Sequence, residues 1–160
     1  MRCVECGERK FREKRKTETM EAAGMRFAAE VPVDVCAKCG HEYLHGPAMV
    51  EFERRVAVEL ARRGAPLAET FRRLRKALGL RAADLAALLE VRPETISRWE
   101  NGQTEVDWPS YLLTWWMVED ALEGKSETMD KLKAPRIAQA PGSRAKPIKV
   151  TLAAPLRRSA

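Results

Sequence analysis

The sequence predicts two folded parts, a small α+β domain followed by an all-α domain, and then a basic, loosely ordered C-terminal tail. Three observations lead to this division. All four cysteines lie between residues 3 and 39. Residues 47 to about 124 carry apolar side chains at the three- and four-residue spacing of buried helix faces. Beyond that, proline and basic residues dominate, as in segments that lack a packed core. We therefore expect a cysteine domain at 1–46, a connector helix and linker at 47–68, a second domain at 69–133 and the tail at 134–160.

The composition indicates a soluble protein with a polyanionic partner. No run approaches the roughly 18–20 apolar residues of a membrane span, so no membrane association is expected. The N-terminus has no apolar core of a secretory signal, which makes the cytoplasm the expected compartment and keeps thiols reduced. The formal net charge is +6. Basic residues concentrate between Arg9 and Lys16 and from Lys131 to the end, where no acid occurs.

Each expected element has its own local signal. The stretches TETMEAA and MRFAAEVPVDV flank Gly24 and predict a β-hairpin. Pro47 and Gly64 suit the first position and the C-terminal cap of a helix. Three more helices are expected before a fourth that starts at Pro109. The helix at 47–63 has a buried stripe of Met49, Phe52, Val56 and Leu60. The buried faces of the next three helices are Phe71, Leu74 and Leu78, then Leu85, Leu88 and Leu89, then Ile96 and Trp99.

The cysteines form two C-x-x-C pairs, Cys3 with Cys6 and Cys36 with Cys39. A tetrahedral zinc ion takes four such thiolates, and a two-residue spacer lets one tight turn offer two of them. Gly7 and Gly40 follow the second cysteine of each pair, where such a turn favours glycine. We therefore expect one structural Zn²⁺ per chain in a zinc-ribbon-like domain. With four cysteines, no open coordination position is left for catalysis.

Other readings of the cysteines stay open. A redox dithiol needs a C-x-x-C beside a βαβ unit, which this sequence lacks, and disulfides fit poorly with a chain that has no secretion signal. His41 and His45 follow the second pair, and either could replace a ligand. Surface or supporting histidines are the preferred interpretation. No Ser/His/Asp or Cys/His constellation is evident, so we expect no enzyme activity.

The stretch VRPETISRWENG predicts a short helix that buries little. Ile96 and Trp99 lie three residues apart and would hold the helix on its domain. The polar remainder fits a helix laid in the DNA major groove, which is about 12 Å wide. There Arg98 can reach a guanine edge and Glu94 a cytosine amine. The other candidate DNA contacts are Thr95 and Ser97 on the helix, and Arg92 and Asn101 at its ends, where phosphate contacts are expected.

Residues 70–102 as a whole resemble the phage-repressor/Cro (Xre-type) helix-turn-helix, through LRKALGL, LAALLEV and TISRWENG. The resemblance implies that residues 91–102 are the recognition helix. It also implies a structural ion pair between Arg75 and Glu100. Many relatives open the second helix with Gln or Thr as a phosphate anchor, where this chain has Arg81, Ala82 and Ala83. We expect Arg81 to substitute.

The order of a C-x-x-C…C-x-x-C domain, a helix and an Xre-type domain resembles the MqsA (YgiT-type) antitoxins, over residues 1 to about 124. That resemblance implies a repressor of its own operon, with residues 1–46 binding a toxin and the C-terminal domain dimerising on a palindromic operator. Arg98 falls where such antitoxins carry a DNA-reading arginine, whereas Glu94 replaces a neutral amide. The alternative is a stand-alone Xre-family regulator with a structural zinc ribbon and no toxin.

The predicted fourth helix, PSYLLTWWMVEDALE, is apolar nearly all round. Such a helix must bury more than one face, so a homodimer interface through Leu112, Trp115 and Trp116 is expected. A more deeply buried core helix is the alternative. The basic run ERKFREKRK could also bind nucleic acid, although a solvated strand face is the preferred interpretation.

Overall fold

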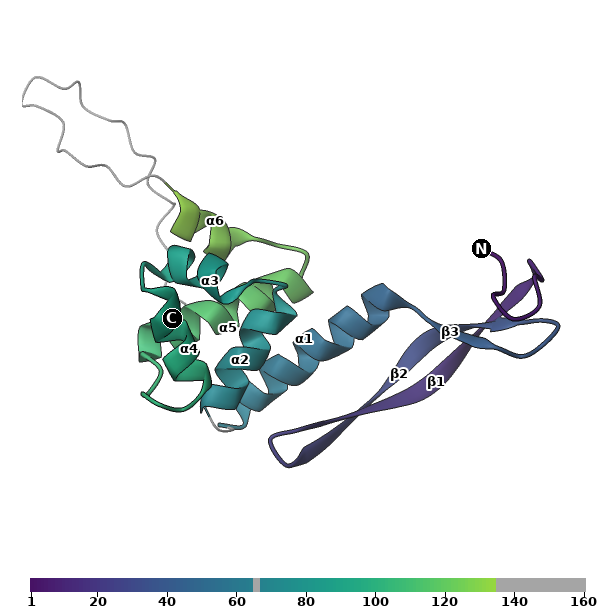
Figure 1. Cartoon of the computed structure of the whole chain (residues 1–160), viewed down its shortest axis with the longest axis horizontal. Coiled ribbons are helices and arrows are strands. Elements are labelled where there is room, and N and C mark those ends of the chain that lie inside the picture. The colour runs from purple at the N-terminus through teal and green to yellow at the C-terminus, as the bar shows by residue number, and fades with distance from the viewer. Residues whose placement is uncertain (65–66, 135–160) are drawn as a thin grey trace, which may run out of the picture.

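The computed structural model describes residues 1–64 and 67–134, so the tail predicted for 134–160 lies outside the described residues except for Ala134. Within these residues it contains one antiparallel sheet and six helices. None of the described helices is both long and apolar enough to cross a membrane. The elements, shown in Figure 1, are β1 (Phe11–Ala22), β2 (Met25–Cys36), β3 (Glu42–Leu44), α1 (Gly46–Arg62), α2 (Leu67–Ala77), α3 (Ala82–Leu89), α4 (Pro93–Glu100), α5 (Trp108–Leu122) and α6 (Glu127–Lys133).

The β-hairpin predicted around Gly24 is confirmed, and it forms most of the sheet. β1 and β2 pair along their whole length, from Phe11 opposite Cys36 to Ala22 opposite Met25. Ala23 and Gly24 both have positive φ, at 49° and 72°, as a two-residue type I′ turn requires. The short strand β3 was not expected, and it pairs with the cysteine end of β2. The strand order is β1-β2-β3.

The connector helix α1 packs on both parts of the molecule. Phe52, Val56 and Leu60 are buried against the hairpin, in a cluster with Met20 and Phe27. The neighbouring positions Ala57, Val58 and Ala61 belong to the helical core instead. Because α1 contributes to both clusters, it joins the hairpin to the helices as a packed element.

The helical core gathers the apolar faces of the remaining helices. Phe71, Leu74, Leu85 and Ile96 are each fully buried. The Phe71 and Trp99 rings meet edge to face, with centroids 5.7 Å apart. Each such side chain contributes about 1.5–3 kcal/mol by leaving water. Ile96 and Trp99 are the two apolar residues that anchor the buried side of α4 on this core.

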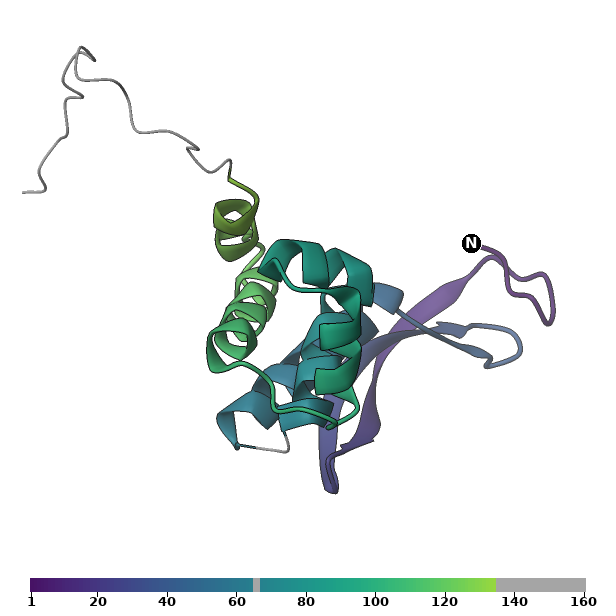
Figure 2. The same cartoon turned by 60° about the vertical axis from the view of Figure 1, so that its left-hand side comes forward.

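The two ends of the hairpin lie in different surroundings. At the turn, the Ala23 N–H donates to Glu69 Oε1 on α2 at 3.0 Å, and Arg73 donates to the Glu21 carbonyl at 3.3 Å. The opposite end, with the N-terminus and β3, stands clear of the helices (Figure 1). Figure 2 shows the same separation from a second direction. The hairpin is therefore docked at its turn and free at its cysteine end.

Candidate metal centre and nucleic-acid interface

The four cysteine sulfurs meet at the free end of the sheet. Sγ of Cys3 lies 3.5 Å from that of Cys39, and Sγ of Cys6 lies 3.6 Å from that of Cys36. All four lie within 4.8 Å of one another. A tetrahedral ion with metal–sulfur bonds of about 2.3 Å needs sulfurs about 3.8 Å apart. The cluster is therefore compatible with a structural metal ion.

The two C-x-x-C turns have the same backbone geometry. The Gly7 N–H donates to the Cys3 carbonyl at 2.9 Å, and the Gly40 N–H donates to the Cys36 carbonyl at 3.0 Å. Both glycines have positive φ, at 72° and 76°, which a residue with a side chain adopts only with strain. Each turn thus directs its two sulfurs to the same point.

Tyr43 of β3 supports the cluster, a role that no pattern in the sequence indicates. Its hydroxyl donates to Cys3 Sγ at 3.4 Å and accepts the Val4 N–H at 2.8 Å. The Tyr43 hydroxyl, with the N–H groups of Glu5 and Cys6, lowers the pKa of Cys3 to about 6 despite desolvation. These donors favour the thiolate, which is the form that binds a metal.

Neither histidine joins the cluster of sulfurs in the described residues. His45 Nε2 faces Asp34 Oδ2 at 2.9 Å, just before α1 begins. The His41 ring meets the Tyr43 ring edge to face, with centroids 4.7 Å apart. In this arrangement neither His41 nor His45 replaces a cysteine ligand.

The helix α4 buries one side and exposes the other. Ile96 and Trp99 are buried, at 0% and 6% exposure. Thr95 is half-buried. The exposed candidates are Arg92, Glu94, Ser97, Arg98 and Asn101. The polar face that the sequence predicts for DNA contact is thus open to solvent.

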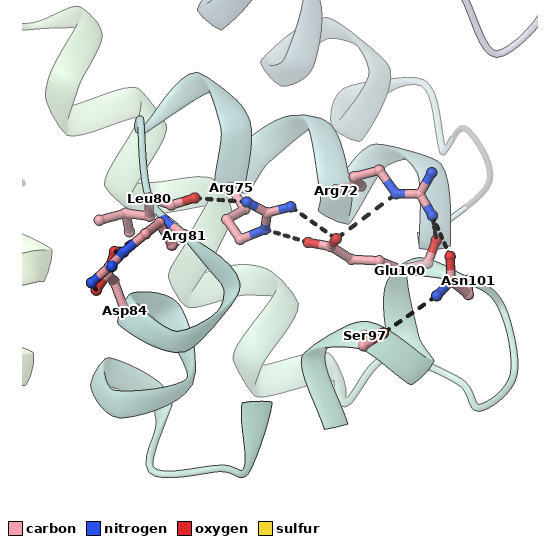
Figure 3. A network of polar contacts seen from close by, with 8 residues as sticks. All are labelled: Arg72, Arg75, Leu80, Arg81, Asp84, Ser97, Glu100 and Asn101. Carbon is pink, nitrogen blue, oxygen red and sulfur yellow. Dashed lines mark hydrogen bonds and ion pairs between the residues drawn. The ribbon is translucent and has the colours of Figure 1, made fainter. Parts of the chain in front are cut away.

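Arg75 and Glu100 form a two-point ion pair between α2 and α4 (Figure 3). The nitrogen–oxygen distances are 2.5 Å from Nε and 2.9 Å from Nη2. The remaining Nη1 donates to the Leu80 carbonyl at 2.7 Å. Only 13% of the Arg75 side chain and 9% of the Glu100 side chain are exposed. The hydrogen bonds to the Glu100 carboxylate raise the pKa of Arg75, so its guanidinium stays protonated.

Arg72 extends this network to the end of α4, which the sequence did not indicate. Its Nη2 donates to the Glu100 carbonyl at 2.5 Å and to Asn101 Oδ1 at 2.7 Å. Asn101 Nδ2 in turn donates to Ser97 Oγ at 3.4 Å. Two of the predicted contact residues, Ser97 and Asn101, are therefore linked to each other and to α2 (Figure 3).

Arg81 is the N-cap residue of α3 and directly follows Leu80, whose carbonyl accepts from Arg75 (Figure 3). Its guanidinium contacts Asp84 through two hydrogen bonds of 2.8 Å and holds the pKa of Asp84 down to about 2. The side chain is nevertheless 83% exposed. A phosphate would have to share Arg81 with Asp84, a partner that the sequence analysis did not assign to it.

The helix α5 presents aromatic surface. Trp116 is 48% exposed, and Trp108, which was not among the residues predicted for an interface, is 55% exposed. Leu112 lies between them on the same face and is half-buried. Trp115 instead packs against the helical core, and its Nε1 is buried without a hydrogen-bond partner in the described residues.

A family model described as a helix-turn-helix domain matches residues 66–124. The match covers α2 to α5, supports the Xre-type part of the resemblance, and indicates a DNA-binding transcriptional regulator. No curated protein and no solved structure matches the chain.

Proposed function

We propose that the protein is a non-enzymatic, sequence-specific DNA-binding repressor of the bacterial cytoplasm that reads its operator through α4. The observation that carries this proposal is the division of α4, which buries only Ile96 and Trp99 and leaves its polar side to solvent. A helix of this kind inside a helix-turn-helix domain is placed to enter the major groove. There Arg98 would contact guanine, and Arg92 and Asn101 would contact phosphate.

We propose that the cysteine cluster holds one structural Zn²⁺ and that residues 1–46 form a zinc ribbon. The donor set supports zinc, because four thiolates at this spacing match its preferred ligands and tetrahedral geometry. The ion would supply the cross-link between the two turns. Within the described residues, neither of the two apolar core clusters includes a residue of the two C-x-x-C turns or of β3.

We propose that the DNA-binding form is a two-fold symmetric homodimer. The aromatic face of α5, with Trp108, Leu112 and Trp116, supplies the unburied surface that such an interface requires. A palindromic operator would present two half-sites to the two copies of α4.

We further propose an MqsA-type antitoxin role, with residues 1–46 as the toxin-binding part. The cysteine end supports this role because it lies away from α4 and exposes apolar side chains, with Val4 at 77% and Leu44 at 47%. A toxin could therefore bind there without occupying the DNA face. A stand-alone Xre-family regulator is the alternative, and it needs no partner at this end.

One experiment tests sequence-specific DNA binding, and a second tests the antitoxin role. Selection of duplexes from a random-sequence library by the full chain should yield a palindrome with half-sites about one helical turn apart. No enrichment would contradict sequence-specific binding. For the antitoxin role, the product of the neighbouring gene should arrest growth when expressed alone, and co-expression of the full chain should restore it. A neighbouring product without effect on growth would favour the stand-alone regulator.

A further inference from the structure

The contact between Arg72 and Asn101 fixes which way the Asn101 amide points. A guanidinium carries only donors, so the Asn101 atom that faces Arg72 Nη2 at 2.7 Å must be the carbonyl oxygen. The amide nitrogen then faces Ser97 Oγ, at 3.4 Å. Figure 3 shows this chain of contacts, from Arg72 to Asn101 and from Asn101 to Ser97.

This orientation leaves both Asn101 and Ser97 with a hydrogen that can be donated to a ligand. The carbonyl oxygen of Asn101 accepts from Arg72, which turns the amide nitrogen toward Ser97 and leaves its second hydrogen able to donate. Ser97 Oγ accepts from Asn101, which leaves the Ser97 O–H to donate. Both residues are exposed on the same end of α4. Together they can present two hydrogens to a ligand, one from the Asn101 amide and one from the Ser97 hydroxyl.

Arg72 is itself held firmly enough to impose this arrangement. Its guanidinium bonds to the Glu100 carbonyl at 2.5 Å and lies 3.8 Å from the Glu100 carboxylate. A cation at this place also caps the last carbonyls of α4. Only 41% of the Arg72 side chain is exposed.

We propose that Arg72 is a positioning residue that, through Asn101, sets Asn101 and Ser97 as paired donors to one phosphate of the DNA backbone. This inference rests on the proposed DNA binding. A phosphate oxygen only accepts hydrogen bonds, so it matches two donors. The contact lies at the end of the helix, where backbone contacts set orientation without reading sequence.

A double-mutant cycle tests whether Arg72 acts through Asn101. The probe is a random-sequence duplex at fixed salt, titrated with the full chain. Asn101→Ala should weaken binding about tenfold, as for the loss of a hydrogen bond to a charged group. Arg72→Met should weaken it similarly, and the double variant should lose no more than either single variant. Losses that multiply would overturn the proposal, because Arg72 would then contact DNA directly.

Two control variants separate positioning from charge. Lys76→Met removes the same charge from the same hollow beside Asn101 and should weaken binding far less. Arg72→Lys keeps the charge but not the planar fork, so binding should stay weak. Full recovery with lysine, or an equal loss in Lys76→Met, would show that charge alone matters. Circular dichroism of each variant should match the parent.

A measurement on the free protein keeps this test independent of DNA binding. The side-chain amide of Asn101 should give rigid NMR signals in the parent chain and mobile ones in Arg72→Met. A mobile Asn101 amide in the parent would end the proposal by itself. A chain that keeps the rigid amide but binds no duplex would instead contradict the proposed function.

Discussion

The two ends of the β1–β2 hairpin are held by different physical means. At the turn, Met20 and Phe27 pack on buried Phe52, Val56 and Leu60 of α1. At the other end, four sulfurs converge within 4.8 Å while nearby Val4 and Leu44 remain exposed. One end therefore depends on apolar burial and the other on the proposed metal. We therefore expect that one end of the hairpin can unfold while the other end stays packed.

Removing the metal should produce the largest effect, and only at the cysteine end. Chelation, or Cys3→Ser, should unfold the two C-x-x-C turns and β3, because a structural metal site contributes its binding free energy to folding. Hydrogen exchange should rise sharply around residues 3–8 and 34–44. The α2–α5 region should keep its protection, since its core contains no cysteine.

Metal analysis of the purified, reduced protein is the companion measurement. One zinc per chain is expected. A metal-free chain with an intact cysteine end would contradict the zinc proposal.

Phe52→Ala should produce the opposite pattern. Phe52 is 6% exposed between α1 and the hairpin, and its truncation should cost about 3–5 kcal/mol of unfolding free energy. Exchange should increase around residues 20–29, whereas zinc content should be unchanged. Val50→Ala, at a 42% exposed position on the same helix, is the matched control. Zinc loss in Phe52→Ala would show that the two ends are coupled.

Breaking the Arg75–Glu100 pair should have a smaller effect on stability and should leave both ends of the hairpin folded. Arg75→Met should cost about 3 kcal/mol, the lower end of the range for breaking a buried pair, because both side chains keep some exposure. Replacing both residues with apolar ones should cost less than the sum of the single changes. Urea denaturation of the parent, the two single variants and the double variant gives the unfolding free energies for this double-mutant cycle. Additive losses would mean that the two residues do not interact in solution.

The sequence predicted those features of the fold and of the candidate sites that depend on residues close together in the chain. The C-x-x-C spacing, the turn at Gly24 and the buried pair Ile96 and Trp99 all follow from residues within a few positions of one another. The structure agrees with each of these. The start of α1 follows in the same way from Pro47.

The remaining contacts join residues that are distant in the chain. Tyr43 reaches Cys3 across 40 positions, and Arg72 reaches Asn101 across 29. Nothing local to a tyrosine or an arginine indicates such a partner, because the contact exists only after the elements pack. The Glu69 contact that docks the hairpin turn on α2 was missed for the same reason.

The most direct test of the central claim is a pair of titrations of Arg98→Ala at fixed salt, one with the selected operator and one with random-sequence duplex. Arg98 is exposed and supports no core, so the variant should fold as the parent does. Operator affinity should fall by about 1–3 kcal/mol for a lost bidentate contact to guanine. Affinity for random duplex should change much less, because the phosphate contacts remain. An equal loss on both duplexes would contradict base reading by α4 and make Arg98 a phosphate contact.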